Sequence, residues 1–318
     1  MLQFSTDDLR EADRFDEWRE ARGKHLFGVT IELDPERRRR FRGSFKAFAV
    51  GGAIASEMQA SSYRVSRTAA DIARLAGNSL CISLQVRGPG ILDTGRHLKQ
   101  SMREGDFAIS HSDLPFTGTP YHYNDFSYRL LKIPLSEELV LGRPAHDLFA
   151  TTLSESPLFR RAFQALFDAL TMRSQTLSNP DVDVLHIARL SMAARGRLPL
   201  TMPEIKTAIR VGLNYAAREI MSRRHHEASL NPANVAAELG VSIRYLHMLF
   251  KNSEMSFSRT LTAMRAEGAY RRLMANPTLA VTQAAYASGF DSIATFYRAF
   301  ANAYGMAPGD LRTMRFAS

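Results

Sequence analysis

Two short stretches, fifty positions apart, carry side chains suited to reading the edges of nucleic-acid bases. In the first, Arg244 can donate a pair of hydrogen bonds to guanine, and His247 can contact a base edge or a phosphate. In the second, Ala294 and the methyl group of Thr295 suit thymine methyl groups, while Arg298 suits guanine or phosphate. These residue types predict contacts in a major groove, provided that short helices present them.

The elements around these residues form a duplicated pattern. A shift of fifty positions superimposes Ala237 on Ala287, Ser242 on Ser292, Ile243 on Ile293, Leu246 on Phe296, and Phe250 on Phe300. Each copy predicts a helix, a tight turn at a glycine, and a second helix capped by a polar residue. The predicted turns lie at Gly240 and Gly289. The predicted cap is Ser242 in the first copy, and Asp291 or Ser292 in the second.

One such hairpin alone is ambiguous, because glycine-turn helical hairpins also occur in proteins that do not bind DNA. Two copies joined by a rigid helix over residues 256–276 can place both second helices on one DNA face, roughly 34 Å apart. The duplication therefore favours a double helix-turn-helix that reads two successive major-groove segments. The DNA-binding candidates are Ser242, Arg244, Tyr245, His247, Met248, Lys251, Ser292, Ile293, Ala294, Thr295 and Arg298.

The last hundred or so residues resemble the DNA-binding domain of the AraC/XylS family of bacterial transcription regulators. The resemblance rests on LGVSIRYLHMLFK, on Arg265, Ala269 and Leu273, and on VTQAAYASGFDSIATFYRAFANAYGMAPGDLR. It implies a regulator that binds double-stranded DNA, most often as an activator that works with RNA polymerase. It also implies a homodimer.

The composition agrees with a DNA partner. The net charge is +9, and residues 201–318 carry 14 Lys and Arg against 8 Asp and Glu. Such a basic excess is permissive for a polyanion partner.

No stretch is apolar enough to span a membrane, the acidic opening does not fit a signal peptide, and a single cysteine, Cys81, fits a reducing compartment. We expect a cytoplasmic protein in which Cys81 is a small strand residue.

The amino-terminal half has a different pattern. Residues 7–27 predict an amphipathic helix with Leu9, Phe15 and Trp18 on its apolar side. From about residue 25 to 135, short alternating runs such as SLCISLQV predict an all-β barrel or sandwich. From about residue 145 onward the spacing becomes helical.

This half is similar to the cupin-like sensor domain of one branch of the same family. The similarity lies in DRFDEWREA, YRVSRTAADI, GRHLKQSMREGDFAISHSDLPF and FSYRLLKIP. It implies a two-domain α+β protein with an amino-terminal cupin-like β-barrel and flanking helices, and a carboxy-terminal all-α double helix-turn-helix domain. We expect an effector-sensing domain over 1–145, a helical dimerisation and linker region over 146–202, and a DNA-binding domain over 203–318.

A small organic effector would bind inside the barrel, because barrel mouths are favoured ligand pockets. The effector-binding candidates are Arg67, Gln85, His111, Phe116 and Tyr121. Arg67 would pair with an anionic ligand. The alternative, which we favour, is that Arg67 makes an internal pair and that His111 is an ordinary loop residue.

Other chemistry is not indicated. The sequence contains no His-x-His pair of a metal-binding cupin, no Gly-x-Ser-x-Gly and no phosphate or dinucleotide loop. We therefore expect neither an enzyme nor a bound metal or cofactor. A second function remains open, in which the amino-terminal barrel docks a protein instead of a small molecule. A ligand-sized polar cavity would favour the effector, and a filled apolar core with an exposed apolar patch would favour the protein partner.

Overall fold

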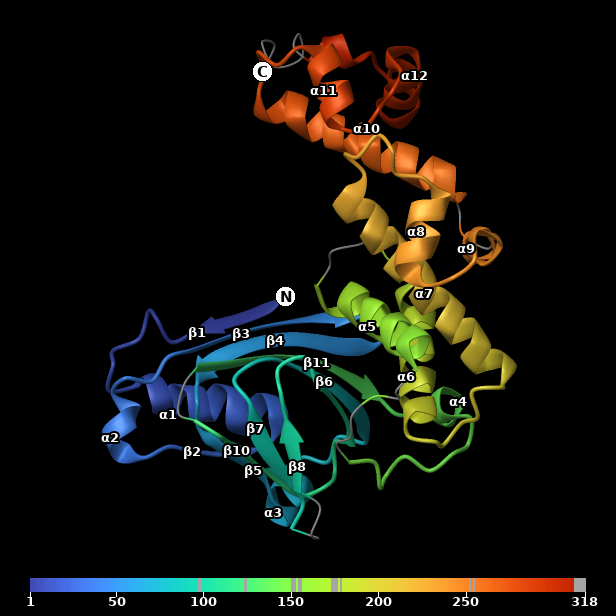
Figure 1. Ribbon diagram of the computed structural model, residues 1–318. Helices are drawn as coiled ribbons and strands as arrows, with labels where there is room; N and C mark the ends of the chain where they lie inside the picture. Colours follow the sequence, from blue (N-terminus) through green and yellow to red (C-terminus); the bar gives the residue numbers. More distant parts are fainter. Residues whose placement is uncertain are drawn as a thin grey trace. The chain divides into compact units, whose positions relative to one another are not determined.

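The computed structural model describes residues 1–95, 99–122, 125–149, 153, 156–172, 177, 179–251, 253 and 255–311, with the side chains of 24–26 left out. The chain divides into two compact units, Met1–Ile209 and Arg210–Ser318. Strands and helices make up the first unit, and helices make up the described part of the second (Figure 1). The α+β two-domain fold class is confirmed.

The strands of the first unit pair into two antiparallel sheets. Their bounds are β1 Leu2–Ser5, β2 Thr30–Glu32, β3 Gly43–Val50, β4 Ala53–Ser61, β5 Arg64–Arg67, β6 Ser79–Arg87, β7 Gly90–Asp93, β8 Lys99–Met102, β9 Phe107–His111, β10 Phe116–Pro120 and β11 Asp125–Pro134. One sheet has the order β1-β3-β4-β11-β6-β9 and the other has the order β2-β5-β10-β7-β8.

Helices flank these sheets. Their bounds are α1 Arg14–Trp18, the π-helix η1 Arg19–Phe27, α2 Pro35–Arg38, α3 Ala69–Arg74, α4 Glu137–Val140, α5 Pro157–Met172 and α6 Pro180–Ala194. The amphipathic helix predicted over 7–27 is thus shorter than expected and continues as a π-helix. Phe15 and Trp18 are fully buried, as its apolar side predicts.

The barrel expected from the sequence does not close. Among the described strands, no hydrogen-bonded pairing joins the six-stranded sheet to the five-stranded sheet. At one end α1 fills the space between the sheets, where Phe15 and Trp18 share a core with residues of β2, β3 and β4 (Figure 1). The two sheets therefore pack face to face around these side chains and do not form one continuous ladder.

Strand β6 shows how one sheet serves two purposes. Its Leu84 pairs with Phe107 of β9, and the ring of Phe107 packs edge-on against Phe163 and Phe167 of α5 at centroid distances of 5.2 and 5.1 Å. The apolar face of β6 therefore packs under α5. The alternate residues line a cavity between the sheets; these are Cys81, Ser83 and Gln85. The alternation in SLCISLQV is confirmed.

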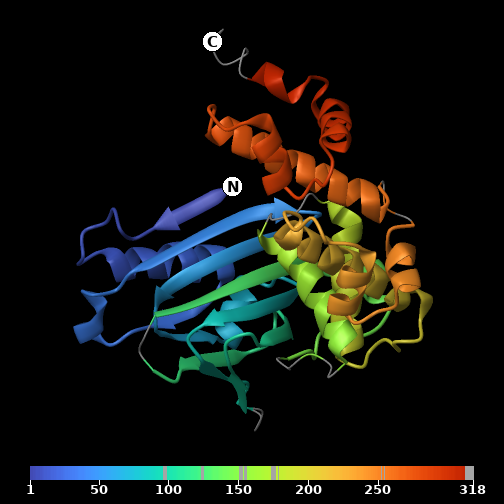
Figure 2. The same ribbon diagram turned by 45° about the horizontal axis from the view of Figure 1, so that its top comes forward.

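The second unit is built from two helical hairpins. Its helices are α7 Pro203–Arg224, within which the boundary between the units falls, α8 Pro232–Leu239, α9 Ile243–Leu249, α10 Phe257–Ala275, α11 Val281–Ala287, α12 Ile293–Tyr304 and the 3-10 turn η2 Pro308–Asp310. In Figures 1 and 2, α10 runs from the α8–α9 hairpin to the α11–α12 hairpin. It is the connecting helix predicted over 256–276.

Buried aromatic side chains hold each hairpin to α10. In the first hairpin the rings of Phe250 and Phe257 meet edge-on at 5.6 Å. In the second, Phe296 and Phe300 are fully buried against Ala266 and Ala269 of α10. Within this unit Figure 1 shows α9 and α12 on the same side of their hairpins, with α8 and α11 on the other side.

Candidate functional site

The first hairpin begins and turns where the sequence predicts. The Asn231 side chain accepts a hydrogen bond from the Asn234 backbone N–H at 3.0 Å and caps α8, with Pro232 at the first helical position. Gly240 ends α8 with φ +77°, a left-handed conformation that favours glycine. Ser242 then caps α9 by accepting from the Tyr245 N–H at 3.1 Å.

Helix α9 buries one side and exposes the predicted reading side. Leu246 and Leu249 are buried, whereas Arg244, His247 and Met248 are exposed. Ser242 and Lys251 are also exposed, and Tyr245 is half-buried. An exposed amino-terminal face on the second helix of a hairpin is the geometry that major-groove reading requires.

The second hairpin repeats this arrangement. Ser292, not Asp291, caps α12 by accepting from the Thr295 N–H at 3.4 Å. Ala294 and Arg298 are exposed, and Ser292, Ile293 and Thr295 are half-buried. Ile293 also packs on the core of this hairpin, which leaves less of its side chain for DNA than the sequence pattern suggested.

One exposed residue was missed in the sequence analysis. Tyr297 is 41% exposed and stands fifty positions after His247, which the sequence analysis did select. The same shift that revealed the duplication therefore pointed to Tyr297. We add it to the predicted reading face of α12, where its hydroxyl and ring can contact phosphate or a base.

The turn of the second hairpin is packed against the segment that precedes the first. A Cβ atom at Gly289 would lie 2.3 Å from the His225 carbonyl oxygen. Arg265 of α10 donates hydrogen bonds to the carbonyl oxygens of His225 and Glu227 at 3.0 and 2.8 Å. Arg265 thus fastens α10 to the segment that precedes the first hairpin, and these hydrogen bonds leave its charge less available to DNA.

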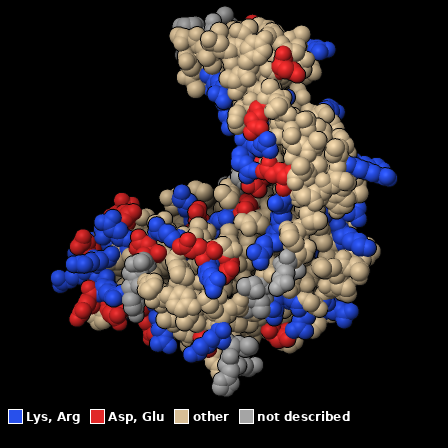
Figure 3. Space-filling view, in the orientation of Figure 1, with Lys and Arg blue, Asp and Glu red and all other residues tan. Residues whose placement is uncertain are grey.

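Acidic partners neutralise part of the positive charge before the first hairpin. Arg224 makes ion pairs with Glu227 and Glu238, both at 2.7 Å, and Arg223 also pairs with Glu238. Hydrogen bonds from Arg224 lower the pKa of Glu227. In Figure 3, basic side chains project at the edge where Figure 1 places α9. On this hairpin, the exposed Arg244 and Lys251 are basic groups that remain available to a polyanion.

The arginine run at residues 37–40 has a different setting. It lies on and just after α2, where basic and acidic side chains are mixed on the surface (Figure 3). Arg37 approaches Asp34 to 3.8 Å. The run is therefore part of a solvated mixed-charge surface in the first unit.

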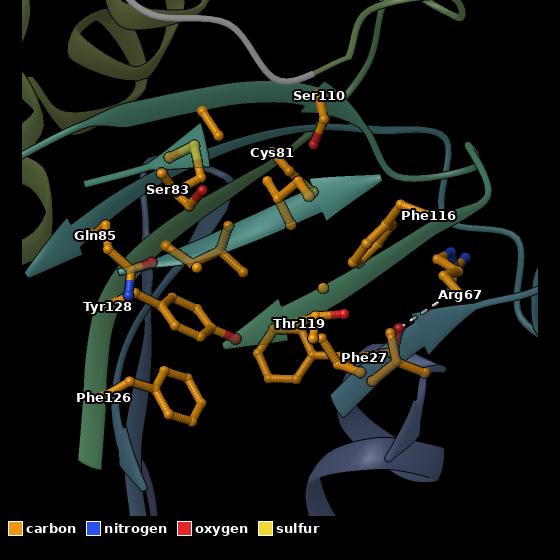
Figure 4. A pocket seen from close by; sticks show the side chains of 18 of the residues that line it. Phe27, Arg67, Cys81, Ser83, Gln85, Ser110, Phe116, Thr119, Phe126 and Tyr128 are labelled. Atoms are coloured by element: carbon orange, nitrogen blue, oxygen red, sulfur yellow. Dashed lines mark hydrogen bonds between the residues drawn. The ribbon is translucent and has the colours of Figure 1, made fainter. Parts of the chain in front are cut away.

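The first unit contains a cavity of about 240 Å³ between its two sheets (Figure 4). Arg67, Gln85, His111 and Phe116 line it, as the sequence analysis expected. Tyr121 does not; it is 45% exposed, and its hydroxyl donates to Ser101 Oγ at 2.9 Å. Phe27, Phe116, Phe126 and Tyr128 surround the space in Figure 4, with Arg67 at its edge.

Arg67 is held by the protein itself. Its Nη1 donates to the Gly28 carbonyl at 2.6 Å, and its Nη2 donates to the Leu75 carbonyl at 2.7 Å and to Asp113 at 3.2 Å. Burial alone would raise the pKa of Asp113, but hydrogen bonds from the Gly77 and Asn78 N–H groups outweigh it and lower this pKa to about 2. The favoured alternative, an internal pair, describes Arg67.

The side chains of Gln85 and His111 are also hydrogen-bonded to other groups of the protein. The Gln85 amide donates to the carbonyl oxygens of Gly88 at 2.6 Å and Arg87 at 2.9 Å. His111 Nδ1 accepts from the Asp113 N–H at 3.1 Å, and burial lowers the pKa of His111. These side chains bound the cavity but have little capacity left for a ligand.

Arg22 lines the cavity and was not selected from the sequence. It belongs to the run REARGK, which has the composition of an exposed helical face. The π-helical turn of η1 changes the spacing of the helix, and Arg22 is only 4% exposed. Nothing in the residue types signals a π-helix, so this position could not be found from the sequence.

The single cysteine and the possible metal ligands can be examined in the described residues. Burial raises the pKa of Cys81 to about 11, so its thiol stays protonated at neutral pH. No group of three or more His, Cys, Asp or Glu in the described part of the chain could hold a metal ion. Among the described helices, none combines the length and apolar composition needed to cross a bilayer.

Two capped helical hairpins with exposed second helices, joined by one long helix, define a double helix-turn-helix protein. A helix-turn-helix domain family matches residues 235–314. The chain is 24% identical over 301 residues to the transcriptional activator NphR of Rhodococcus sp, covering 90% of this chain and 85% of that one. The resemblance predicted from the sequence is confirmed: the carboxy-terminal part of the chain is an AraC-type helix-turn-helix domain, and the chain is similar to a transcriptional activator, which is a DNA-binding protein and not an enzyme.

Solved structures also match parts or most of the chain. The AraC-like transcriptional activator CuxR matches with a TM-score of 0.49 and 18% identity, over 90% of this chain and all 100% of that one. The carboxy-terminal domain of AraT, a response regulator from Geobacillus stearothermophilus, matches with a TM-score of 0.30 and 29% identity. That match covers 32% of this chain and 85% of the AraT domain.

Proposed function

We propose that this chain is a sequence-specific transcription activator of the cytoplasm whose DNA binding responds to a small molecule held between the sheets of its first unit. The observation that carries sequence-specific reading is the repeated burial pattern of α9 and α12. After a shift of fifty positions, buried Leu246 matches buried Phe296, and exposed Arg244 matches exposed Ala294. Two equivalent exposed helical faces support two reading elements in one chain.

The direction of regulation comes from the comparison. NphR is named a transcriptional activator, and activation by this chain would require RNA polymerase as a partner. We further propose a homodimer, with residues 1–145 sensing the effector, 146–202 forming the dimer and linker, and 203–318 binding DNA. The apolar face of α5 in that middle region is buried within the first unit, so the dimer surface would use the other side of these helices.

The cavity favours an effector over the protein-docking alternative. A docking module would be expected to have a filled core, whereas the sheets here enclose about 240 Å³. One water molecule needs roughly 10–15 Å³ of such volume, so the cavity has room for a small organic molecule. The sequence analysis named a polar cavity as the sign of an effector site. The lining of this cavity contains more aromatic side chains than that criterion describes.

Selection of DNA from a random duplex library by the full chain tests sequence-specific binding. We expect enrichment of a site with two conserved segments whose centres lie about 10 base pairs apart. The matched control is the double variant Arg244→Ala, Arg298→Ala, which should enrich a weaker motif or none. Binding of the wild-type chain without any enriched motif would contradict sequence-specific regulation.

A further inference from the structure

The segment between α7 and α8 packs against the turn of the second hairpin. This segment includes His225 and His226, and the first hairpin begins after it at Pro232. A Cβ atom at Gly289 would lie 2.3 Å from the His225 carbonyl oxygen and 3.0 Å from the His226 carbonyl carbon. Two backbones approach this closely only where one of them carries no side chain. The second hairpin is therefore in direct contact with the segment that leads into the first, in addition to its link through α10.

Helix α10 packs against the same segment. Arg265 donates hydrogen bonds to the carbonyl oxygens of His225 and Glu227 at 3.0 and 2.8 Å. A Cβ atom at Gly268 would lie 2.8 Å from Nε2 of the His225 ring, so glycine leaves the space that this ring occupies. On its other side, His225 Nδ1 donates to the Ser222 carbonyl oxygen at 2.7 Å. These contacts form a joint, which consists of residues 225–228, Arg265, Gly268 and Gly289.

Ion pairs connect the joint to the first hairpin. Arg224, directly before the joint, lies 2.7 Å from Glu227 within it and 2.7 Å from Glu238 of α8. Arg223 also pairs with Glu238. Only residues 229–231 separate the joint from the start of α8. A shift of the joint against the second hairpin would therefore move the first hairpin with it.

The joint contains features that reduce stability. Gly268 lies in the middle of α10, where glycine is less favourable than alanine. Ser288 Oγ lies 3.6 Å from the Cβ position of Gly268, is fully buried, and has no hydrogen-bond partner among the described residues. Departures of this kind from the most stable choice of residue occur at functional sites. They indicate that the joint provides a defined geometry and does not serve stability alone.

We infer that this joint sets the spacing between the two DNA segments that the chain reads, with Arg265 and Gly289 as positioning residues. Two reading helices on one DNA face lie roughly 34 Å apart. One added base pair moves the second segment by about 3.4 Å and turns it by roughly 35° around the DNA axis. A fixed joint does not follow that change, whereas a loosened joint does. The inference rests on the proposed reading of DNA by both α9 and α12.

A series of duplexes with altered spacing tests this inference. The selected site is prepared at its natural spacing, with one base pair removed between the two segments, and with one or two base pairs added. For the wild-type chain we expect the affinity to fall at least about tenfold at each altered spacing, because one helix then meets the wrong bases. Gly289→Ala forces the joint apart at the His225 carbonyl and should reduce this fall to less than about threefold. Fluorescence anisotropy measures the affinities.

Gly240→Ala is the matched control. The φ of Gly240, +77°, is close to the +88° of Gly289, so alanine meets similar backbone strain, but a Cβ atom there would meet nothing within 4 Å. This control should keep the wild-type dependence on spacing. The same dependence in Gly289→Ala, or its loss in both variants, would overturn the inference. If circular dichroism shows that Gly289→Ala does not fold, Arg265→Met takes its place, with the exposed Arg272→Met as its control.

A measurement without DNA separates this inference from the proposed function. Spin labels on Ala233→Cys of α8 and Thr282→Cys of α11, both exposed positions, report the distance between the hairpins in a Cys81→Ser chain. Gly289→Ala should broaden the distance distribution, and Gly240→Ala should not. A broadened distribution with an unchanged dependence on spacing would show that the joint holds the hairpins without setting the spacing.

Two further outcomes concern the wild-type chain. If it tolerates every spacing of a specifically bound site, the inference fails while sequence-specific regulation stands. If selection enriches no site, the proposed function fails and the spacing role fails with it, whereas the spin-label distances still show whether the joint fixes the two hairpins.

Discussion

Hydrogen bonding divides the arginines of this chain into those that hold the fold and those that are free to bind. Arg67 and Arg265 donate to backbone carbonyls and fix loops in place. Arg244 and Arg298 are exposed, and neither makes a hydrogen bond or ion pair with the described part of the chain. Only the second group can bind DNA without first breaking an internal contact.

Replacement of Arg244 by alanine tests base reading. We expect the loss of about 1–3 kcal/mol of binding free energy on the selected site and little loss on random DNA, because a base contact matters only where its base is present. Fluorescence anisotropy with the two duplexes measures both affinities. The control is Arg272→Ala, another exposed arginine of the same unit. An equal loss on both duplexes would assign Arg244 to phosphate only.

Residue types and their spacing were sufficient to predict some features of the candidate sites, but not all of them. The caps at Ser242 and Ser292 follow from serine before an apolar helical stripe, and the exposed faces follow from the helical period. Arg22 was missed because its burial depends on a local change of helical period. The structural role of Arg265 was not foreseen, because the carbonyl oxygen of His225 that it meets lies 40 residues away in sequence.

The turns are the elements that decide how the two hairpins are joined. Gly240 and Gly289 both have left-handed backbone conformations, with φ of +77° and +88°. Their surroundings differ, because a Cβ atom at Gly240 would meet nothing within 4 Å, whereas one at Gly289 would meet the His225 carbonyl. The first turn therefore needs glycine for its conformation alone, and the second also needs it for close packing.

Alanine at each turn separates these two requirements. Gly240→Ala should lower the free energy of unfolding of the second unit by about 1 kcal/mol, the usual cost of a left-handed non-glycine residue. Gly289→Ala should cost about 1–3 kcal/mol more, since the backbone of His225 must move. Urea denaturation followed by circular dichroism measures both. Equal losses for the two variants would show that Gly289 is not in close contact with the segment at His225.

Elements defined by nearby residues were predicted better than pairings between distant ones. The alternation of β6 and the hairpins of the second unit depend on spacing within about twenty residues, which the sequence displays directly. The expected closed barrel depended on which strands pair across the whole first unit. Phe15 and Trp18 pack in the core that lies between the two sheets, and spacing along the chain does not reveal this arrangement.

At the level of the complete chain, the proposed tasks of sensing an effector and reading DNA fall to two different compact units. The first has a cavity lined in part by aromatic rings and by the buried Arg22, and the second has two exposed helical faces. The division agrees with the uneven charge of the sequence, in which residues 201–318 carry 14 basic against 8 acidic side chains. We propose that one copy of the second unit reads two successive segments of DNA.

Hydroxyl-radical footprinting on the selected site shows whether one copy of the chain protects two segments. For the wild-type chain we expect two protected segments about one helical turn apart for each copy bound. Arg244→Ala should weaken protection of one segment, and the double variant Tyr297→Ala, Arg298→Ala should weaken protection of the other. If both variants weaken the same segment, or if the second variant leaves the footprint unchanged, α12 does not read DNA and the account is wrong.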